Sequence, residues 1–175
     1  MNNQLLQKKI CMLGIFGVGK TSLTRRFVYD KFDDTYLSTI GVKISQKLMP
    51  PVQNSSGNQV QFNFMLWDIE GAENPAPAIR NYLLGSEGAI IVSDLTRMES
   101  IEAIPAIINL YHQSCPEKSI IVAGNKCDLL EDFTSPANRL QEIAAEQNLE
   151  FYLTSAKNGQ NVEQLFLKLG LLIAK

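Results

Sequence analysis

A glycine-rich segment followed by lysine and threonine is the strongest chemical signal in this sequence. It reads GIFGVGKT from Gly14 to Thr21, and a short apolar run precedes it. Glycines allow consecutive backbone N–H groups to form an anion nest, and a helix that starts directly afterwards adds the positive end of its dipole. In this pattern Lys20 reaches the outer phosphates and the Thr21 hydroxyl binds magnesium. The segment therefore predicts a site for a phosphate chain.

Two polar tetrapeptides further along the chain are candidates for recognising a base. Asn125 to Asp128 (NKCD) follows the apolar run IIVAG, and Thr154 to Lys157 (TSAK) follows FYL. Both lie at the carboxyl ends of expected strands, where doubly wound sheets bind ligands. Guanine presents two adjacent donors that a carboxylate accepts together, so Asp128 would select guanine over adenine. Each tetrapeptide alone is more often a solvated turn, but their order after GIFGVGKT favours a guanine site.

Hydrophobic periodicity predicts strands that alternate with helices. The expected strands are Lys8–Leu13, Val42–Met49, Gln59–Trp67, Ala89–Val92, Ile120–Ala123 and Glu150–Leu153, with a hairpin turn over 50–58; the expected helices are Lys20–Tyr29, Ser100–Tyr111, Ala137–Gln147 and Val162–Ile173. Pro105 interrupts one helical period, and Ser135-Pro136 suits a cap and first turn. Asn161 with Gln164 suggests a capping box. The alternation predicts an α/β fold: a doubly wound, mostly parallel six-stranded sheet with helices on both faces and one antiparallel hairpin strand.

Composition narrows the class of protein. The chain has 175 residues, 45% of them hydrophobic and 19% charged, with a net charge of −2. This length suits one domain over residues 1–175, and the charge balance argues against nucleic-acid binding. Three cysteines at unrelated spacings suit neither a disulfide framework nor a metal knuckle. A reducing, cytoplasmic location is therefore expected.

The sequence carries none of the common signals for membrane attachment. The sequence holds no run of 18 apolar residues, Asn2 stands where myristoylation needs glycine, and no prenylation box closes the chain. We expect a monomer without an intrinsic membrane anchor.

Taken together with TIGV at 39–42 and WDIEG at 67–71, these segments resemble the five guanine-nucleotide motifs of Ras-like small GTPases. Their order and spacing match over essentially the whole chain, and the stretch YLSTIGVKI looks most like the Rab branch. The resemblance implies the small G-protein form of the P-loop fold and a switch between GTP and GDP states, with Mg²⁺ as cofactor. It also implies effector, GAP and exchange-factor partners that bind through the regions 33–42 and 68–82.

The resemblance assigns roles to individual residues of these motifs. Nucleotide binding falls to Phe16, Gly17, Val18, Gly19, Lys20, Thr21, Ser22, Phe32, Tyr36, Thr39, Gly71, Asn125, Lys126, Asp128, Ser155, Ala156 and Lys157. Magnesium would be held by Thr21, Thr39 and Asp68, and catalysis would use Lys20, Thr39 and Gly71. Phe32 and Tyr36 stand where the family places one aromatic on the guanine edge and another over the phosphates. Burial in the core is the alternative for both.

Three positions depart from the family pattern. Ala72 stands directly after the Asp-x-x-Gly glycine, where small GTPases usually carry a glutamine that orients the attacking water. Phe16 replaces a small P-loop residue and would crowd the space that an inserted arginine finger needs. Glu70 would either bring a carboxylate near the γ-phosphate or point to solvent. Because phosphoryl transfer depends on positioning, these departures predict very slow intrinsic hydrolysis.

The sequence is compatible with two functions from different classes. One is a switch that cycles when a partner donates the missing group, and the other is a GTP-bound binding module that hydrolyses negligibly. A P-loop ATPase is less well supported, since Asp128 would face the wrong base edge.

Overall fold

The central feature of the computed structural model is one seven-stranded sheet. The structure describes residues 4–35, 41–53, 56–69, 77–132 and 134–174. The strands are β1 (Gln4–Leu13), β2 (Val42–Leu48), β3 (Val52–Gln53), β4 (Gln59–Ile69), β5 (Gly88–Asp94), β6 (Ser119–Asn125) and β7 (Glu150–Leu153). Their order is β2-β4-β1-β5-β6-β7, and β3 pairs with β4. Among the described strands, only β2 and β3 pair antiparallel with β4, so the sheet is mostly parallel.

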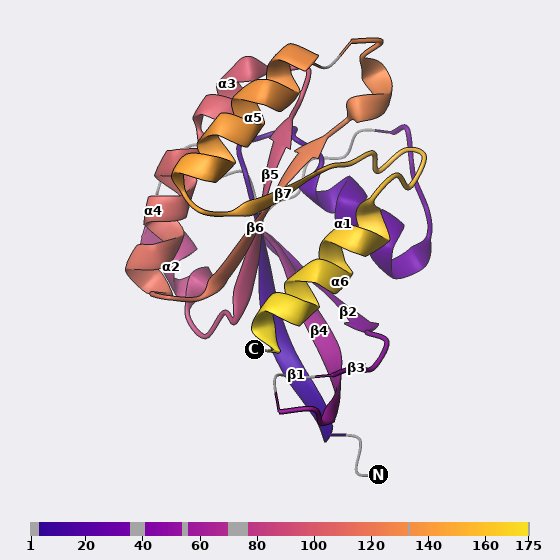
Figure 1. The fold of residues 1–175 in the computed structure, drawn as a ribbon, viewed down its shortest axis with the longest axis vertical. Helices are drawn as coiled ribbons and strands as arrows, with labels where there is room; N and C mark the ends of the chain where they lie inside the picture. Colours follow the sequence, from indigo (N-terminus) through magenta and orange to yellow (C-terminus); the bar gives the residue numbers. More distant parts are fainter. Residues whose placement is uncertain (1–3, 36–40, 54–55, 70–76, 133, 175) are drawn as a thin grey trace.

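Helices cover both faces of this sheet (Figure 1). They are α1 (Lys20–Tyr29), α2 (Pro77–Leu83), α3 (Met98–Glu102), α4 (Ile104–Ser114), α5 (Thr134–Glu146) and α6 (Val162–Ile173), with a 3₁₀ turn at Cys127–Leu129. Residues of α2, α3, α4 and α5 pack in one buried cluster, and residues of α1 and α6 pack in the other. Apolar side chains on β5, which is buried throughout, contribute to both clusters. The two cores hold the central strands rigidly between the helical layers.

Strand register brings the candidate motifs to one edge. β4 lies on one side of β1 and β5 on the other, so the chain reverses its winding direction at β1. Met12 pairs with Asp68, and Asp94 pairs with Asn125. The carboxyl ends of the parallel strands β1, β4, β5 and β6 therefore meet at the topological switch point, which is where such sheets bind ligands.

The predicted architecture is confirmed: the sheet is doubly wound and mostly parallel, and helices lie on both faces. The six expected strands form the main order, and the added two-residue β3 lies within the segment expected to be the hairpin turn. The helix expected over Ser100–Tyr111 is in fact two, α3 and α4, separated at Ala103. Pro105 lies in the first turn of α4, where its missing N–H has no intrahelical partner to lose.

One expected helix start and one expected helix cap were wrong. α5 begins at Thr134, so Ser135 and Pro136 lie inside its first turn and not ahead of it. The capping box at Asn161 does not form, because Asn161 is left-handed, with φ 55°, and makes no side-chain cap hydrogen bond. Its amide donates instead to the carbonyl oxygen of Leu153 at 2.8 Å. A contact across the fold has replaced the local one.

No helix within the described ranges is long and apolar enough to cross a membrane.

Candidate functional site

The glycine-rich loop joins β1 to α1, as the sequence predicts, and only glycine fits at two of its positions. Gly14 and Gly19 have φ angles of 148° and 100°, which side chains with a Cβ rarely adopt. A Cβ on Gly14 would lie 2.3 Å from the carbonyl oxygen of Val92, and one on Gly19 would lie 2.3 Å from Asn125 Nδ2. The loop is therefore packed closely against the ends of β5 and β6.

Lys20 is almost fully buried, with 7% of its surface exposed. Its ammonium donates to the carbonyl oxygens of Gly14 at 2.9 Å and Ile15 at 3.0 Å. These bonds fold the side chain back over the first half of the loop. A fixed positive charge at this place suits a phosphate that the loop amides would hold.

Two oxygen groups meet beside the first turn of α1. Thr21 Oγ1 donates a hydrogen bond to Asp68 Oδ2, which lies near the end of β4 and is 1% exposed. A hydroxyl and a carboxylate are hard oxygen ligands of the kind that Mg²⁺ prefers, and Mg²⁺ completes its shell with waters and substrate phosphates. The described residues hold no group of three or more His, Cys, Asp or Glu side chains around a metal position. Thr21 and Asp68 therefore fit a magnesium ion shared with a nucleotide.

Asn125 ties the base motif to the phosphate loop. It is 1% exposed, and its Nδ2 donates to the carbonyl oxygen of Val18 at 3.0 Å. Its Oδ1 accepts from the backbone N–H of Ala156 at 3.2 Å and from the Thr154 hydroxyl at 3.3 Å. One amide side chain thus joins GIFGVGKT, NKCD and TSAK, so the three segments predicted to form one site do lie together.

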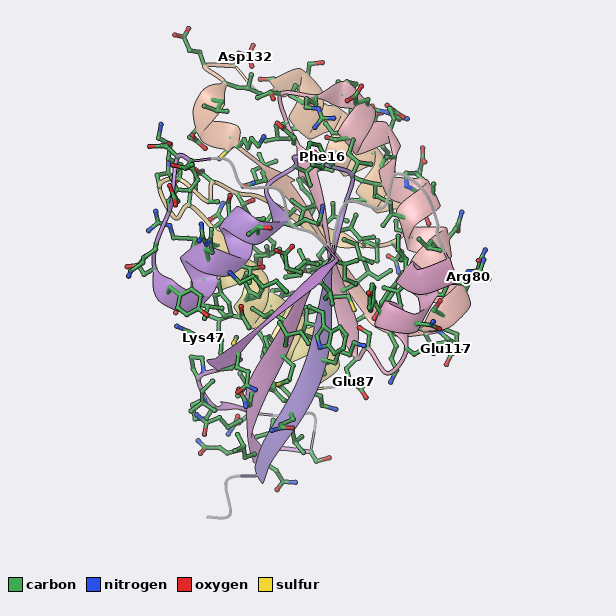
Figure 2. The ribbon with its side chains drawn as sticks, turned by 180° about the vertical axis from the view of Figure 1, so that it is seen from behind. Phe16, Lys47, Arg80, Glu87, Glu117 and Asp132 are labelled. Carbon is green, nitrogen blue, oxygen red and sulfur yellow. The ribbon has the colours of Figure 1, made fainter. Side chains whose placement is uncertain are left out.

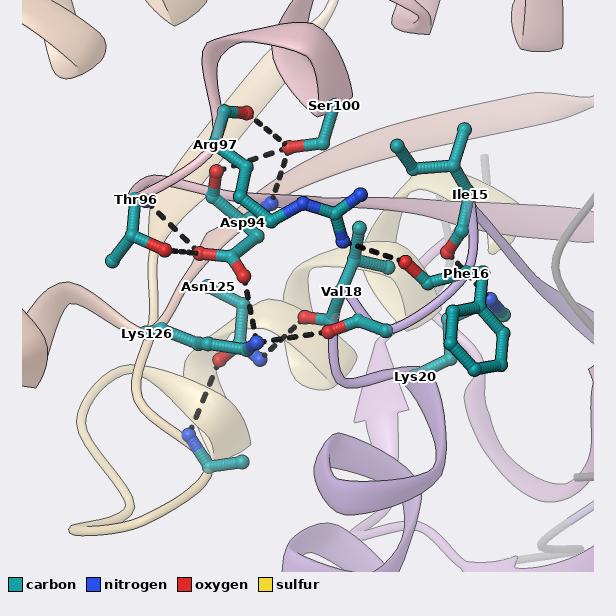
Figure 3. A network of polar contacts seen from close by, with 12 residues as sticks. Ile15, Phe16, Val18, Lys20, Asp94, Thr96, Arg97, Ser100, Asn125 and Lys126 are labelled. Carbon is teal, nitrogen blue, oxygen red and sulfur yellow. Dashed lines mark hydrogen bonds and ion pairs between the residues drawn. The ribbon is translucent and has the colours of Figure 1, made fainter. Parts of the chain in front are cut away.

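The second and fourth residues of NKCD are also held by neighbouring motifs. Lys126 donates to the carbonyl oxygen of Gly17 at 2.8 Å and pairs with Asp94 Oδ2 at 2.6 Å (Figure 3). The Ser155 hydroxyl donates to Asp128 Oδ1 at 2.5 Å. That bond orients the carboxylate, whose remaining acceptor capacity suits a pair of donors such as the guanine edge presents.

Helix α1 also holds the TSAK segment, through the side chain of Arg26. Arg26 donates from Nε to the carbonyl oxygen of Ala156 at 2.8 Å and from Nη2 to that of Lys157 at 2.6 Å. The main chain of TSAK is thereby fixed relative to the helix that follows the phosphate loop. Ala156 is buried and Lys157 is exposed.

Cys127 lies within NKCD, but its thiol is poorly suited to redox chemistry. The residue is buried, and its Sγ contacts Gln160 Oε1 at 3.5 Å. Burial raises the pKa of the Cys127 thiol, and the adjacent Asp128 carboxylate raises it further. The reactive thiolate is therefore scarce at neutral pH.

The two aromatic candidates within the described ranges differ in exposure. Phe16 projects from the loop with 44% of its surface exposed, and Figure 2 shows it far from Glu87, which directly precedes β5. Phe32 is half-buried and packs against the core cluster that includes α1 and α6. Ser22 is half-buried in the first turn of α1. The remaining candidates, Tyr36, Thr39, Glu70, Gly71 and Ala72, lie outside the described residues.

Sequence reasoning missed two residues at this edge. Asp94 ends β5 and is 1% exposed, and Arg97 three positions later donates from Nη1 to the carbonyl oxygen of Phe16 at 2.7 Å. Neither belongs to a motif. The available signal was positional, because both follow a fully buried strand at the edge where the motifs gather.

The fold and this site define a protein of the small GTPase class. The family model described as "Ras family" matches residues 9–175. Human Ras-related protein Rab-31 is 36% identical over 159 residues, which cover 90% of this chain and 78% of the relative. Rab-5A of Dictyostelium discoideum is 36% identical over 169 residues, or 96% and 81% of the two chains. The GTP-binding protein ypt5 of Schizosaccharomyces pombe is 36% identical over 163 residues, or 92% and 75%. The chain belongs to the Ras family, on the side of its Rab branch.

Proposed function

We propose that residues 1–175 form a single guanine-nucleotide-binding domain that holds GTP or GDP with Mg²⁺ and hydrolyses GTP very slowly without a partner. Membership of a family of GTP-binding switches supports the first part. The second part depends on one observation: Ala72 stands where the family carries a water-orienting glutamine.

The described residues support a division of labour within this site. Amides of the loop from Gly17 to Thr21 would hold the phosphates together with Lys20, and Asp128 would accept the guanine edge. Magnesium would be held by Thr21 and Asp68, and by Thr39 from outside the described residues. When bound, it neutralises charge on the phosphates. Gly71 is proposed to contribute its backbone N–H to the γ-phosphate.

Slow hydrolysis follows from what alanine lacks. Phosphoryl transfer in this class needs little covalent help from the protein but does need an aligned water. A methyl side chain has no donor or acceptor with which to align it. The exposed ring of Phe16, on the loop itself, adds a steric obstacle to an arginine supplied in trans. A protein of this kind rests mainly in the GTP state, and partners would recognise regions 33–42 and 68–82.

A second candidate is a GTP-bound interaction module that does not cycle at all. The same observation supports it, because Ala72 leaves open whether a partner supplies the missing group. The two are separated by the nucleotide found after native purification. Bound GTP that stays intact for days favours the module, whereas bound GTP that converts to GDP over hours favours the slowly hydrolysing switch.

The direct test is single-turnover hydrolysis of GTP by wild type, Ala72→Gln and Ala145→Gln. We expect wild type at or below about 10⁻⁴ s⁻¹, near or under the intrinsic Ras rate. Ala72→Gln should raise this rate roughly tenfold, less than the roughly 10²–10³-fold effect of one oriented donor, because Phe16 and Glu70 remain unchanged. Ala145→Gln makes the same change on the exposed side of α5 and should match wild type. Wild-type turnover as fast as GAP-assisted relatives would refute the proposal.

A further inference from the structure

Three successive carbonyl groups of the phosphate loop each accept a hydrogen bond from a side chain outside the loop (Figure 3). Arg97 Nη1 donates to the oxygen of Phe16 at 2.7 Å. Lys126 Nζ donates to that of Gly17 at 2.8 Å, and Asn125 Nδ2 to that of Val18 at 3.0 Å. Arg97 lies in the turn after β5, Asn125 is the last residue of β6, and Lys126 directly follows it.

These bonds determine which way the loop amides face. In a trans peptide the C=O of one residue and the N–H of the next point in opposite directions. No described peptide bond is cis. Holding the carbonyls of residues 16, 17 and 18 toward the strand ends therefore aims the N–H groups of residues 17, 18 and 19 to the opposite side. Successive N–H groups aimed to one side form an anion nest.

Arg97 is the one donor of the three that no sequence motif assigns. Its Nε and Nη2 both donate to Glu99 Oε1, at 3.2 Å and 2.6 Å. The carboxylate thus restrains the guanidinium, whose remaining fork nitrogen reaches Phe16. A Cβ placed on Gly17 would lie 3.3 Å from Arg97 Nη1, so the guanidinium packs against the loop at that residue.

The turn after β5, which includes Asp94 and Arg97, is held by several side-chain hydrogen bonds and contacts Lys126. Asp94 Oδ1 accepts from the backbone N–H of Thr96 at 2.9 Å and from its hydroxyl at 2.7 Å. The Ser100 hydroxyl contacts the carbonyl oxygens of Asp94 at 3.0 Å and Arg97 at 2.7 Å. The other carboxylate oxygen of Asp94 pairs with Lys126. One turn after β5 therefore positions two of the three donors.

We propose that Arg97 is a positioning residue for the phosphate nest: it holds the Phe16–Gly17 peptide so that the Gly17 N–H faces a bound nucleotide. This inference rests on the guanine-nucleotide site proposed above. The alternative interpretation is that Arg97 only forms a surface ion pair with Glu99, and such a pair contributes little to stability. The two interpretations predict different behaviour, because only a positioning role couples the guanidinium to nucleotide release.

The test measures dissociation of fluorescent mant-GDP from Mg²⁺-loaded protein, chased with excess GDP. Arg97→Gln removes the charged donor, and we expect release about tenfold faster, which corresponds to about 1.4 kcal/mol. Arg97→Lys retains a charge but not the fork, so its rate should lie between wild type and Arg97→Gln. The matched control is Arg139→Gln, because Arg139 has similar exposure and likewise pairs with carboxylates, Glu102 and Glu142. Its release rate should equal that of wild type.

A second readout separates positioning from simple loss of stability. The ³¹P resonance of the β-phosphate in bound GDP should shift in Arg97→Gln and stay at the wild-type position in Arg139→Gln. If Arg97→Gln releases mant-GDP at the Arg139→Gln rate, or releases it faster with an unmoved ³¹P resonance, the inference is overturned. If wild type itself fails to bind mant-GDP, the proposed guanine-nucleotide site is what fails.

Discussion

Thr21 Oγ1 donates to Asp68 Oδ2 across 47 positions of sequence and joins the start of α1 to the end of β4. The pair places a hydroxyl oxygen and a carboxylate oxygen next to each other beside the phosphate loop. Thr21 and Asp68 are both among the residues expected to bind magnesium. The contact shows that the fold brings them within bonding distance of each other.

Magnesium should therefore slow nucleotide release through Thr21. In wild type we expect chelation by EDTA to accelerate mant-GDP release roughly tenfold or more, since a divalent ion bridges protein and phosphates. Thr21→Val keeps the shape and removes the hydroxyl, so release should be fast in Mg²⁺ and change little with EDTA. The measurement is the ratio of release rates with and without EDTA.

Thr24→Val supplies the matched control on the same helix. Thr24 is 3% exposed, and its hydroxyl has no hydrogen-bond partner among the described residues. Replacing it should leave the EDTA ratio at its wild-type value. An unchanged ratio in Thr21→Val as well would remove Thr21 from the magnesium site.

Much of the fold was predictable because strong periodicity coincides with local signals. Helix α1 follows directly from the glycine-rich loop, and the bounds of α1, β7 and α6 match their expected ranges. The motifs lie together because parallel strands bring their carboxyl ends to one edge, a consequence of topology that sequence order already implies.

What could not be predicted depends on contacts between distant residues. Asn161 has the side chain of a helix cap, yet its amide donates to Leu153, and only the path of the chain after β7 makes that oxygen available. Arg97 reaches Phe16 across 81 positions because the turn after β5 is locked by Asp94 and Ser100. A single sequence gives no indication of such a turn geometry. The effect of Ala72 on hydrolysis, by contrast, is predicted from the sequence alone, because Ala72 lies outside the described residues.

Gly19 provides a test of how tightly the phosphate loop is packed. Gly19→Ala combines an unfavourable positive φ with a Cβ 2.3 Å from Asn125 Nδ2, which must move and release the carbonyl of Val18. Leaving such buried groups unpaired costs about 1–3 kcal/mol beyond the backbone strain. We expect mant-GDP affinity to fall roughly a hundredfold, which equilibrium titration would measure.

Gly85→Ala isolates the backbone strain alone. Gly85 also has a positive φ, 74°, but a Cβ there would meet nothing within 4 Å. This variant should lose about 1–2 kcal/mol of unfolding free energy in urea and retain wild-type nucleotide affinity. Equal affinity in the two variants would show that the contact between Gly19 and Asn125 does not shape the site.

Cys11 makes the stability of the fold depend on pH in the alkaline range. The residue lies on β1 with no exposed surface, and burial raises the pKa of its thiol from 9.0 to about 11. Below pH 9 the thiol is protonated in both the folded and the unfolded chain, so its contribution is fully present. Between pH 9 and 11 only the unfolded chain ionises, so stability falls as pH rises, by about 2–3 kcal/mol in total.

Cys11→Ala should remove this pH dependence and leave a constant cavity cost. Urea unfolding followed by the fluorescence of Trp67, the single tryptophan of the chain, would give both free energies at pH 8, 9, 10 and 11. Tyr111 stays protonated in the folded chain over this range because burial raises its pKa, and its ionisation in the unfolded chain is common to both proteins. We expect wild type to lose its advantage over Cys11→Ala progressively above pH 9. A difference that stays constant to pH 11 would mean that the folded chain ionises Cys11 as readily as the unfolded chain does.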